Sequence, residues 1–299
     1  IYIYIYRKNI FLSSLYYYLF IIIIMVSIIG LGFVGSSMYK SFELKGVKNL
    51  FGYDKYKNGG IGSFEECLNS KVCFLALPTP FSYEENKYDK KAIETVCKDL
   101  EKNNYNGLVV LKSTVEPETT NNLSLKYNLK MVHNPEFLTA RTAFEDFHNQ
   151  DHIVLGKGIN CSDEDLNILK KFYKKYYPLA AISLCNSIES ESMKSFVNCF
   201  YSVKIQFFNE LYLLCQKNNS DYNKVKELML KNGWINPMHT DVPGPDGKLS
   251  YGGLCFPKDT NALSRYMNEK EVPNKVLNAV IEERNEMRDD HDNCLLKND

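Results

Sequence analysis

The sequence has no excess of charge of either sign. Its 299 residues include 36 Lys and Arg against 36 Asp and Glu, and no basic cluster is interleaved with aromatic residues. The positive field that would hold a nucleic acid is missing, so we expect no nucleic-acid partner. Internal repeats and low-complexity linkers are also missing. Because 44% of the residues are hydrophobic and 24% are charged, the composition excludes a mainly disordered chain.

Paired cysteines are missing as well. The nine cysteines are odd in number, scattered and never in Cys-x-x-Cys spacing, which argues against a zinc site and a disulfide framework. We therefore expect no metal, reduced thiols and a cytoplasmic protein, with most of the cysteines filling the core. They are Cys67, Cys73, Cys97, Cys161, Cys185, Cys199, Cys215, Cys255 and Cys294.

The first 24 residues differ from the rest. They are apolar and aromatic, with Arg7 and Lys8 as the only charges. A membrane anchor or signal peptide is one interpretation, but the apolar run continues without a polar stop into the first expected strand. The hypothesis we favour is a translated AT-rich tract ahead of a start at Met25, and on that hypothesis no membrane association is expected.

Short apolar runs alternate with longer amphipathic segments from Met25 to about Asn186. The runs are bounded by turn residues and predict strands, whereas the segments between them predict helices. This pattern is typical of an α/β fold, a Rossmann-type, mostly parallel, doubly wound sheet with helices on both faces. The expected strands lie at residues 26–30, 49–53, 72–77, 107–111, 130–133, 152–156 and 181–184.

The period of the apolar residues changes at Ile188. Spacings of three and four continue to Asn218 and predict one long connecting helix. A helix at 221–230, a Gly/Pro-rich loop at 236–257 and two helical segments starting near Asp259 and Asn274 follow. We expect an NAD-binding domain at 25–187 and an α-helical substrate and dimerisation domain at 188–299.

A glycine-rich loop follows the first expected strand. Gly30, Gly32 and Gly35 have GxGxxG spacing: the first permits a tight turn, the second lets the backbone approach a pyrophosphate, and the third lets helix and strand pack closely. Asp54, at the end of the next strand, can accept hydrogen bonds from both ribose hydroxyls and would repel a 2′-phosphate. NAD is therefore the predicted cofactor. Lys55 leaves NADP as an alternative, and a plain turn with structural glycines is another.

Two further clusters suggest chemistry by themselves. Cys255 lies on a glycine-rich loop before a helix whose dipole would lower the pKa of a nearby thiol, so it is a candidate nucleophile. Lys194 and Asn198, four residues apart on the long helix, project from one face and can donate hydrogen bonds to an oxyanion. Taken alone, this pair could equally be a solvated face.

Several motifs together resemble one family. LPTP (77–80), KSTVEPET (112–119), HNPEFL (133–138), ESMKSFVN (191–198) and YGGLCFPKDT (251–260) occur in the order and spacing of the UDP-glucose 6-dehydrogenase family, the nucleotide-sugar dehydrogenases. The resemblance covers residues 25–288. The family's usual third region, a second nucleotide-binding domain, has no counterpart, so the chain resembles a short form or a fragment.

The resemblance implies NAD-dependent oxidation of the C6 alcohol of a nucleotide sugar, UDP-glucose first among the candidates, in two steps. Cys255 would hold the aldehyde as a thiohemiacetal and then a thioester. Glu136 would work with the water of hydrolysis, Thr114 would position that water, and Asp259 matches the family's acid. Further implied cofactor-binding residues are Phe33, Val34, Pro78, Thr79, Ser113 and Thr114. Implied substrate-binding residues are Glu136, Phe137, Leu138, Lys194, Asn198, Tyr251, Gly252 and Gly253.

This chain also departs from the family pattern. Ala140 stands where a second glutamate is common, and Leu254 stands where serine is frequent. Two rival functions stay open, a two-electron β-hydroxyacid-type dehydrogenase and a non-catalytic NAD-binding remnant. The apolar residues around the long helix predict a homodimer, with a substrate cleft between the two domains.

Overall fold

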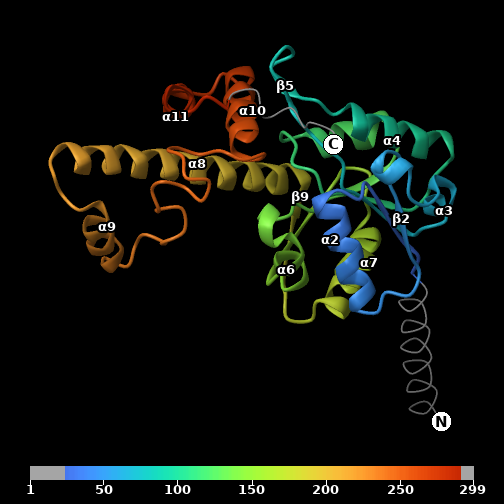
Figure 1. Ribbon diagram of the computed structural model, residues 1–299. Coiled ribbons are helices and arrows are strands. Elements are labelled where there is room, and N and C mark those ends of the chain that lie inside the picture. Colours follow the sequence, from blue (N-terminus) through green and yellow to red (C-terminus); the bar gives the residue numbers. More distant parts are fainter. Residues whose placement is uncertain (1–23, 291–299) are drawn as a thin grey trace, which may run out of the picture. The chain divides into compact units, whose positions relative to one another are not determined.

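A computed structural model describes residues 24–290 of the chain (Figure 1). The apolar segment at residues 1–23 and the last nine residues, with Cys294, lie outside the described residues. The chain divides into two compact units. Unit 1 contains the residues up to Pro78 and the segment Lys90–Glu191, and unit 2 contains Thr79–Asp89 and the residues from Ser192 onward.

A seven-stranded sheet forms the centre of unit 1, in the order β2-β1-β3-β6-β7-β8-β9. Neighbouring strands are parallel except β7 and β8, which are antiparallel. Every strand lies where the apolar runs predict it, so the expected mostly parallel sheet is confirmed. The strands are β1 Val26–Ile29, β2 Leu50–Tyr53, β3 Val72–Leu75, β6 Leu108–Leu111, β7 Lys130–His133, β8 His152–Lys157 and β9 Ala181–Asn186.

Both faces of the sheet are covered by helices (Figure 1). In β3, Phe74 packs with α2, α6 and α7 on one face, whereas Cys73 and Leu75 pack with α3, α4 and α5 on the other. This double burial explains why the strands are continuous apolar runs rather than alternating ones. The helices of unit 1 are α2 Phe33–Leu44, α3 Phe64–Leu68, α4 Lys91–Lys102, α5 Thr119–Lys126, α6 Ala143–His148 and α7 Asp163–Tyr176, with short 3₁₀ turns at Lys57–Gly59 and Ala140–Thr142.

The long helix α8, Ser187–Lys217, starts directly after the edge strand β9. Its first turn belongs to unit 1, where Ser187, Ser190 and Glu191 are buried. Oγ of Ser190 is hydrogen-bonded to Nδ1 of His133 at 2.8 Å, and Oε1 of Glu191 accepts the amide hydrogen of Thr120 at 2.7 Å. The second of these contacts gives one orphan amide at the start of α5 a partner. The remaining turns of α8 belong to unit 2.

Unit 2 is mainly helical. Besides α8 it contains α9 Tyr222–Lys231, α10 Phe256–Glu269 and α11 Lys275–Met287, close to the predicted segments. It also contains a hairpin, β4 Phe81–Ser82 and β5 Lys87–Tyr88, which the sequence analysis places within the NAD-binding domain. Strands of two residues carry too few side chains to show a period, so the sequence could not reveal them.

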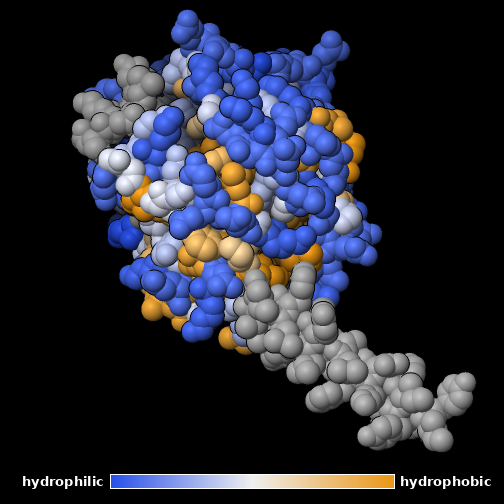
Figure 2. Space-filling view, turned by 90° about the vertical axis from the view of Figure 1, so that its right-hand side faces the viewer, coloured by the Kyte–Doolittle hydropathy of each residue, from blue (hydrophilic) through white to orange (hydrophobic). Residues whose placement is uncertain are grey.

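On the face that Figure 2 displays, polar side chains predominate and apolar ones occur in small groups between them. Among residues 24–290, no helix is long and apolar enough to cross a membrane.

The buried Glu191 gives the first testable prediction. Burial raises its pKa from 4.5 to about 7, against the lowering effect of the Thr120 hydroxyl, the Thr120 and Glu118 amides and the Lys90 charge. Between pH 4.5 and 7 the folded chain therefore holds a proton that the unfolded chain has released. Linkage then lowers the free energy of unfolding as the pH rises, by up to about 3 kcal/mol.

Glu191→Gln keeps an oxygen for the Thr120 amide but removes this titration. Its stability relative to the wild type should rise between pH 5 and pH 8, measured by urea unfolding. Glu43→Gln, at an exposed position of α2, is the control. A difference between wild type and Glu191→Gln that stays constant with pH would contradict a titrating buried carboxyl.

Candidate active site

The glycine-rich loop connects β1 to α2. Because β1 lies between β2 and β3 in the sheet, the loop is at the point where the order of the strands reverses. Gly30 has φ +90°, and a Cβ there would lie 2.5 Å from the carbonyl oxygen of Ala76. A Cβ on Gly35 would lie 1.8 Å from the carbonyl oxygen of Gly30, whereas a Cβ on Gly32 would meet no atom within 4 Å. At the two outer positions backbone atoms therefore leave no room for any residue other than glycine. The middle one leaves open space at the start of the helix.

Asp54 ties the end of β2 to this loop. Its Oδ2 accepts the amide hydrogen of Leu31 at 2.7 Å, and its Oδ1 accepts those of Tyr56 and Lys57 at 3.0 Å. Partial burial raises its pKa, but these three hydrogen bonds and the Lys57 charge lower it more, so the net pKa is below the usual value. An ionised carboxylate can accept about four hydrogen bonds, so Asp54 with these three donors can still accept one from a ribose hydroxyl.

The loop after β6 carries Ser113 and Thr114, as the KST motif predicts. Oγ of the buried Ser113 donates to the carbonyl oxygen of Leu77 at 2.6 Å, so it fastens the end of the β3 loop to the β6 loop. The preceding Lys112 is 2% exposed, and its Nζ donates to Oδ1 of Asn134 at 3.0 Å. This buried cation braces the loop that carries Glu136, a role that the sequence analysis did not foresee.

Glu136 is half-buried after β7, and its Oε2 accepts the amide hydrogen of Leu138 at 2.6 Å. Phe137 is 43% exposed. The carboxylate is thus held in a defined orientation by its own loop, with an apolar side chain beside it. Glu136 and Thr114 both belong to unit 1, together with the glycine-rich loop. Thr79, predicted to bind the cofactor, is buried and belongs to unit 2.

Cys255 is exposed and is the N-cap residue of α10. The helix begins at Phe256, three residues earlier than the sequence suggests, so the thiol is at the helix terminus itself, where the dipole favours a thiolate. Six of the eight described cysteines are buried and Cys185 is half-buried. Burial raises the pKa of Cys67 to about 11 and that of Cys97 to about 12. Those buried thiols are protonated at neutral pH.

Asn198 and Asp259 meet within unit 2. Nδ2 of Asn198 donates to Oδ2 of Asp259 at 2.6 Å, and the Asp259 side chain is fully buried. Lys258 and Tyr88 both reach Oδ1 of the same carboxylate at 2.5 Å. Lys194, one helical turn before Asn198, is 5% exposed. The predicted Lys/Asn pair is therefore buried and is no solvated face.

The predicted substrate-binding residues before Cys255 divide into two kinds. Tyr251 is 2% exposed, and its carbonyl oxygen accepts Nε of Arg284 at 3.3 Å, so its side chain belongs to the interior of unit 2. A Cβ on Gly252 would lie 2.4 Å from the guanidinium of Arg288. Gly253 has φ +76° and open space around it, which suits a turn that presents the next residues to a ligand.

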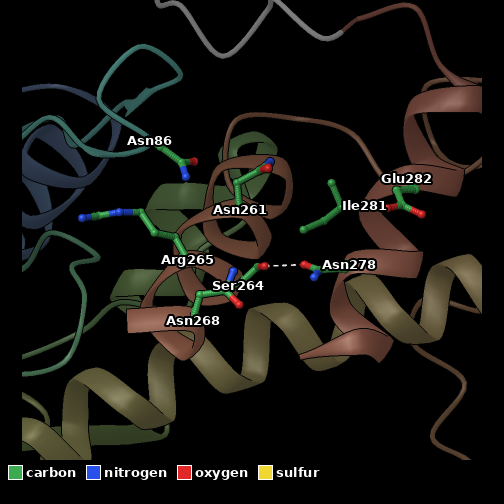
Figure 3. A pocket seen from close by; sticks show the side chains of 8 residues that line it. All are labelled: Asn86, Asn261, Ser264, Arg265, Asn268, Asn278, Ile281 and Glu282. Carbon is green, nitrogen blue, oxygen red and sulfur yellow. Dashed lines mark hydrogen bonds between the residues drawn. The ribbon is translucent and has the colours of Figure 1, made fainter. Parts of the chain in front are cut away.

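A polar hollow of about 150 Å³ lies elsewhere in unit 2, lined by residues of α10 and α11 and by Asn86 (Figure 3). Amide side chains predominate around it, and Oγ of Ser264 donates to Oδ1 of Asn278 at 2.5 Å. None of the predicted site residues lines it. The lining residues are Asn86, Asn261, Ser264, Arg265, Asn268, Asn278, Ile281 and Glu282.

Comparison with known proteins identifies the family. Residues 62–177 match the NAD binding domain of the UDP-glucose/GDP-mannose dehydrogenase family, and residues 188–286 match its central domain. The chain belongs to this family. Two domain matches in the correct order confirm the resemblance that the five motifs indicate, and with it the expected α/β fold class.

Curated relatives and a solved structure agree with this assignment. The UDP-glucose 6-dehydrogenase of Rickettsia bellii is 32% identical, over 74% of this chain and 51% of the relative. That of Campylobacter jejuni is 30% identical, over 75% of this chain and 55% of the relative. A UDP-glucose dehydrogenase structure from Pyrobaculum islandicum is 27% identical, with a TM-score of 0.76 over 88% of this chain and 68% of the other. The chain spans about half the length of the curated relatives it matches.

The residues of unit 1 fit NAD. The β1 turn admits no side chain at Gly30 or Gly35, the open space at Gly32 lies at the N-terminus of α2, and Asp54 is held ionised beside the loop. A pyrophosphate is stabilised by such a helix terminus, and a ribose by such a carboxylate. Gly32 and Asp54 are therefore the residues that would hold the pyrophosphate and the adenosine ribose, respectively.

Two alanine substitutions separate the roles of these glycines. Gly35→Ala should lower Tm, because its Cβ would overlap a backbone oxygen, and overpacking of about 1–3 kcal/mol exceeds the ~1 kcal/mol gained in helix propensity. Gly32→Ala should stay close to the wild type in Tm but bind NAD at least about tenfold more weakly, since the methyl group takes the place of the pyrophosphate. Thermal unfolding and calorimetric NAD titration measure the two effects. Equal NAD affinity in Gly32→Ala and wild type would contradict the assignment.

Proposed function

We propose that the protein is an NAD-dependent nucleotide-sugar 6-dehydrogenase that oxidises the C6 alcohol of UDP-glucose to the carboxylate. The observation that supports this most directly is the exposed thiol of Cys255 at the N-terminus of α10, followed one turn later by the buried Asp259 that holds Asn198. A two-electron dehydrogenase needs no such thiol. The relatives' names supply the substrate class, and this chain's residues supply the chemistry.

When bound, NAD would supply the hydride acceptor, and two successive oxidations of the same carbon would use two NAD molecules. After the first, the Cys255 sulfur adds to the aldehyde carbon and the carbonyl oxygen takes up a proton, which gives a thiohemiacetal. Loss of the second hydride and of that proton leaves a thioester. Water then adds to the thioester carbonyl, the carbon–sulfur bond breaks, and the acid and the thiol are released. No aldehyde leaves the enzyme along this route.

Charge develops on the substrate oxygen when sulfur or water adds to the carbonyl. Lys194 and Asn198 are the donors that we assign to this oxygen, because both are buried side chains on one helix face, where hydrogen bonds to an anion are strongest. We assign Glu136 to the water of hydrolysis, with Thr114 positioning that water. With Ala140 in place of a second glutamate, the proton transfers at this step depend on Glu136 alone.

Counting the NADH formed per sugar tests the proposal. The wild-type chain should form two NADH per UDP-glucose and release UDP-glucuronate, identified by mass spectrometry. Cys255→Ser should lose acid formation by at least about a hundredfold while its NAD affinity is unchanged, because the glycine-rich loop belongs to unit 1. Cys185→Ser is the control, since that thiol is half-buried in β9. One NADH with a stable aldehyde or ketone product would instead support the two-electron alternative.

We further propose that the protein is a homodimer joined along α8. Four large apolar side chains of this helix, Phe196, Phe200, Phe207 and Leu214, are 51–63% exposed, whereas Phe208 is buried inside unit 2. Phe196 and Phe200 also line an apolar hollow of about 470 Å³. Exposed apolar surface of this kind is uncommon on monomers, and the same helix of a second copy can cover it by two-fold symmetry.

A charge on this surface tests the dimer. Phe200→Asp should change the mass measured by light scattering from twice 34.6 kDa to 34.6 kDa at micromolar concentration, because an unpaired carboxylate would be buried in the interface. Leu125→Asp replaces a 59% exposed leucine in unit 1 and should leave the dimer intact. A monomeric wild-type chain would refute the proposal.

A further inference from the structure

The carboxylate of Asp259 connects three segments of unit 2 that are distant in the sequence. It accepts the hydroxyl of Tyr88 from β5, the amide of Asn198 from α8, and the ammonium of its neighbour Lys258. A charge without any exposed surface is stable in a protein only when partners of this kind surround it. Asp259 is thus a fixed anion that orients the groups around it.

Tyr88 is the partner with no place in the proposed reaction so far. It is 2% exposed and packs with Phe81 and Ala262, and the Lys258 ammonium lies 4.8 Å from its ring centroid. Its hydroxyl is 2.5 Å from Oδ1 of Asp259, a short contact typical of a donor to a charged acceptor. The ring therefore packs in the interior of unit 2, whereas the hydroxyl donates a hydrogen bond to the carboxylate.

We propose that Tyr88 is a positioning residue of the reaction, which acts through Asp259 on Asn198. The Tyr88 hydroxyl fixes the rotation of the carboxylate, and the other carboxylate oxygen takes one of the two amide hydrogens of Asn198. The second amide hydrogen then has a defined direction in which to donate to the substrate oxygen. This inference rests on the proposed function.

Two other titratable groups face Asp259. The Lys258 ammonium shares Oδ1 with Tyr88, and Sγ of Cys199, from α8, lies 3.4 Å from the Asp259 carbonyl oxygen. Burial raises the pKa of Cys199, so that this thiol stays neutral. Lys258 and Asn198 are therefore two groups that stabilise the carboxylate. The Tyr88 hydroxyl adds a third, neutral stabilising group.

Tyr88→Phe removes the hydroxyl and keeps the ring. With UDP-glucose and NAD, kcat should fall about tenfold or more, the range expected when a hydrogen bond to a charged group is lost. The dissociation constant for NAD should not change. KM for UDP-glucose should keep its wild-type value, because loss of an interaction made only in the transition state lowers kcat and kcat/KM equally. Tyr83→Phe, 50% exposed on the same hairpin, should match the wild type in all three measurements.

A second measurement does not depend on turnover. In urea unfolding, Tyr88→Phe should be less stable than the wild type, because the fully buried Asp259 side chain loses one donor. The same substitution should cost less in an Asp259→Asn background, where the hydroxyl has no carboxylate to contact. A hydroxyl that only fills space would cost the same in both backgrounds. Wild-type kcat in Tyr88→Phe would overturn the positioning role, and an equal loss of stability in both backgrounds would overturn the contact with the Asp259 carboxylate. A wild-type chain without turnover would refute the proposed function, while the stability measurement still decides whether Tyr88 supports the anion.

Discussion

The contact between Glu191 and the amide of Thr120 fixes where α8 begins. The first turn of α8 has almost no freedom, since Ser190 is bonded to His133, and a Cβ on Gly156 of β8 would lie 2.5 Å from that of Ser190. Lys194 is three residues after Glu191 on the same helix, so a rotation of this turn would redirect its ammonium group. Burial of an ionisable carboxyl costs stability, and here the group that incurs the cost is the one that sets the direction of α8.

The sequence predicted the parts of the fold that local patterns encode. Seven apolar runs became seven strands, and β1, β3 and β6 are buried along their whole length because helices cover both faces of the sheet there. The change of period at Ile188 located α8 to within one residue. The glycine-rich turn and the position of Asp54 beside it could also be predicted, since both depend on backbone atoms of the neighbouring loop. Their contacts with one another fit a dinucleotide loop.

Other parts depend on pairs of residues that are distant in the chain, and no periodicity reveals them. Tyr88 reads as one more aromatic residue until the fold brings it to Asp259, 171 residues later. Lys112 reads as a surface lysine until it is found beneath the Asn134 loop. For Cys255 the motif identified the residue but not its exact place, because the helix was expected to begin near Asp259. Pro257 suits the first turn of a helix, so α10 begins directly after the thiol.

The segment Thr79–Asp89, which contains the hairpin, belongs to unit 2 but is joined at both ends to unit 1. It leaves unit 1 after Pro78, where the β3 loop is fastened by Ser113, and returns at Lys90. Tyr88 is therefore two residues from a segment of unit 1, just as Asn198 is seven residues after the buried turn of α8. Both groups that hold the Asp259 side chain from outside α10 thus lie a short distance along the chain from segments of unit 1.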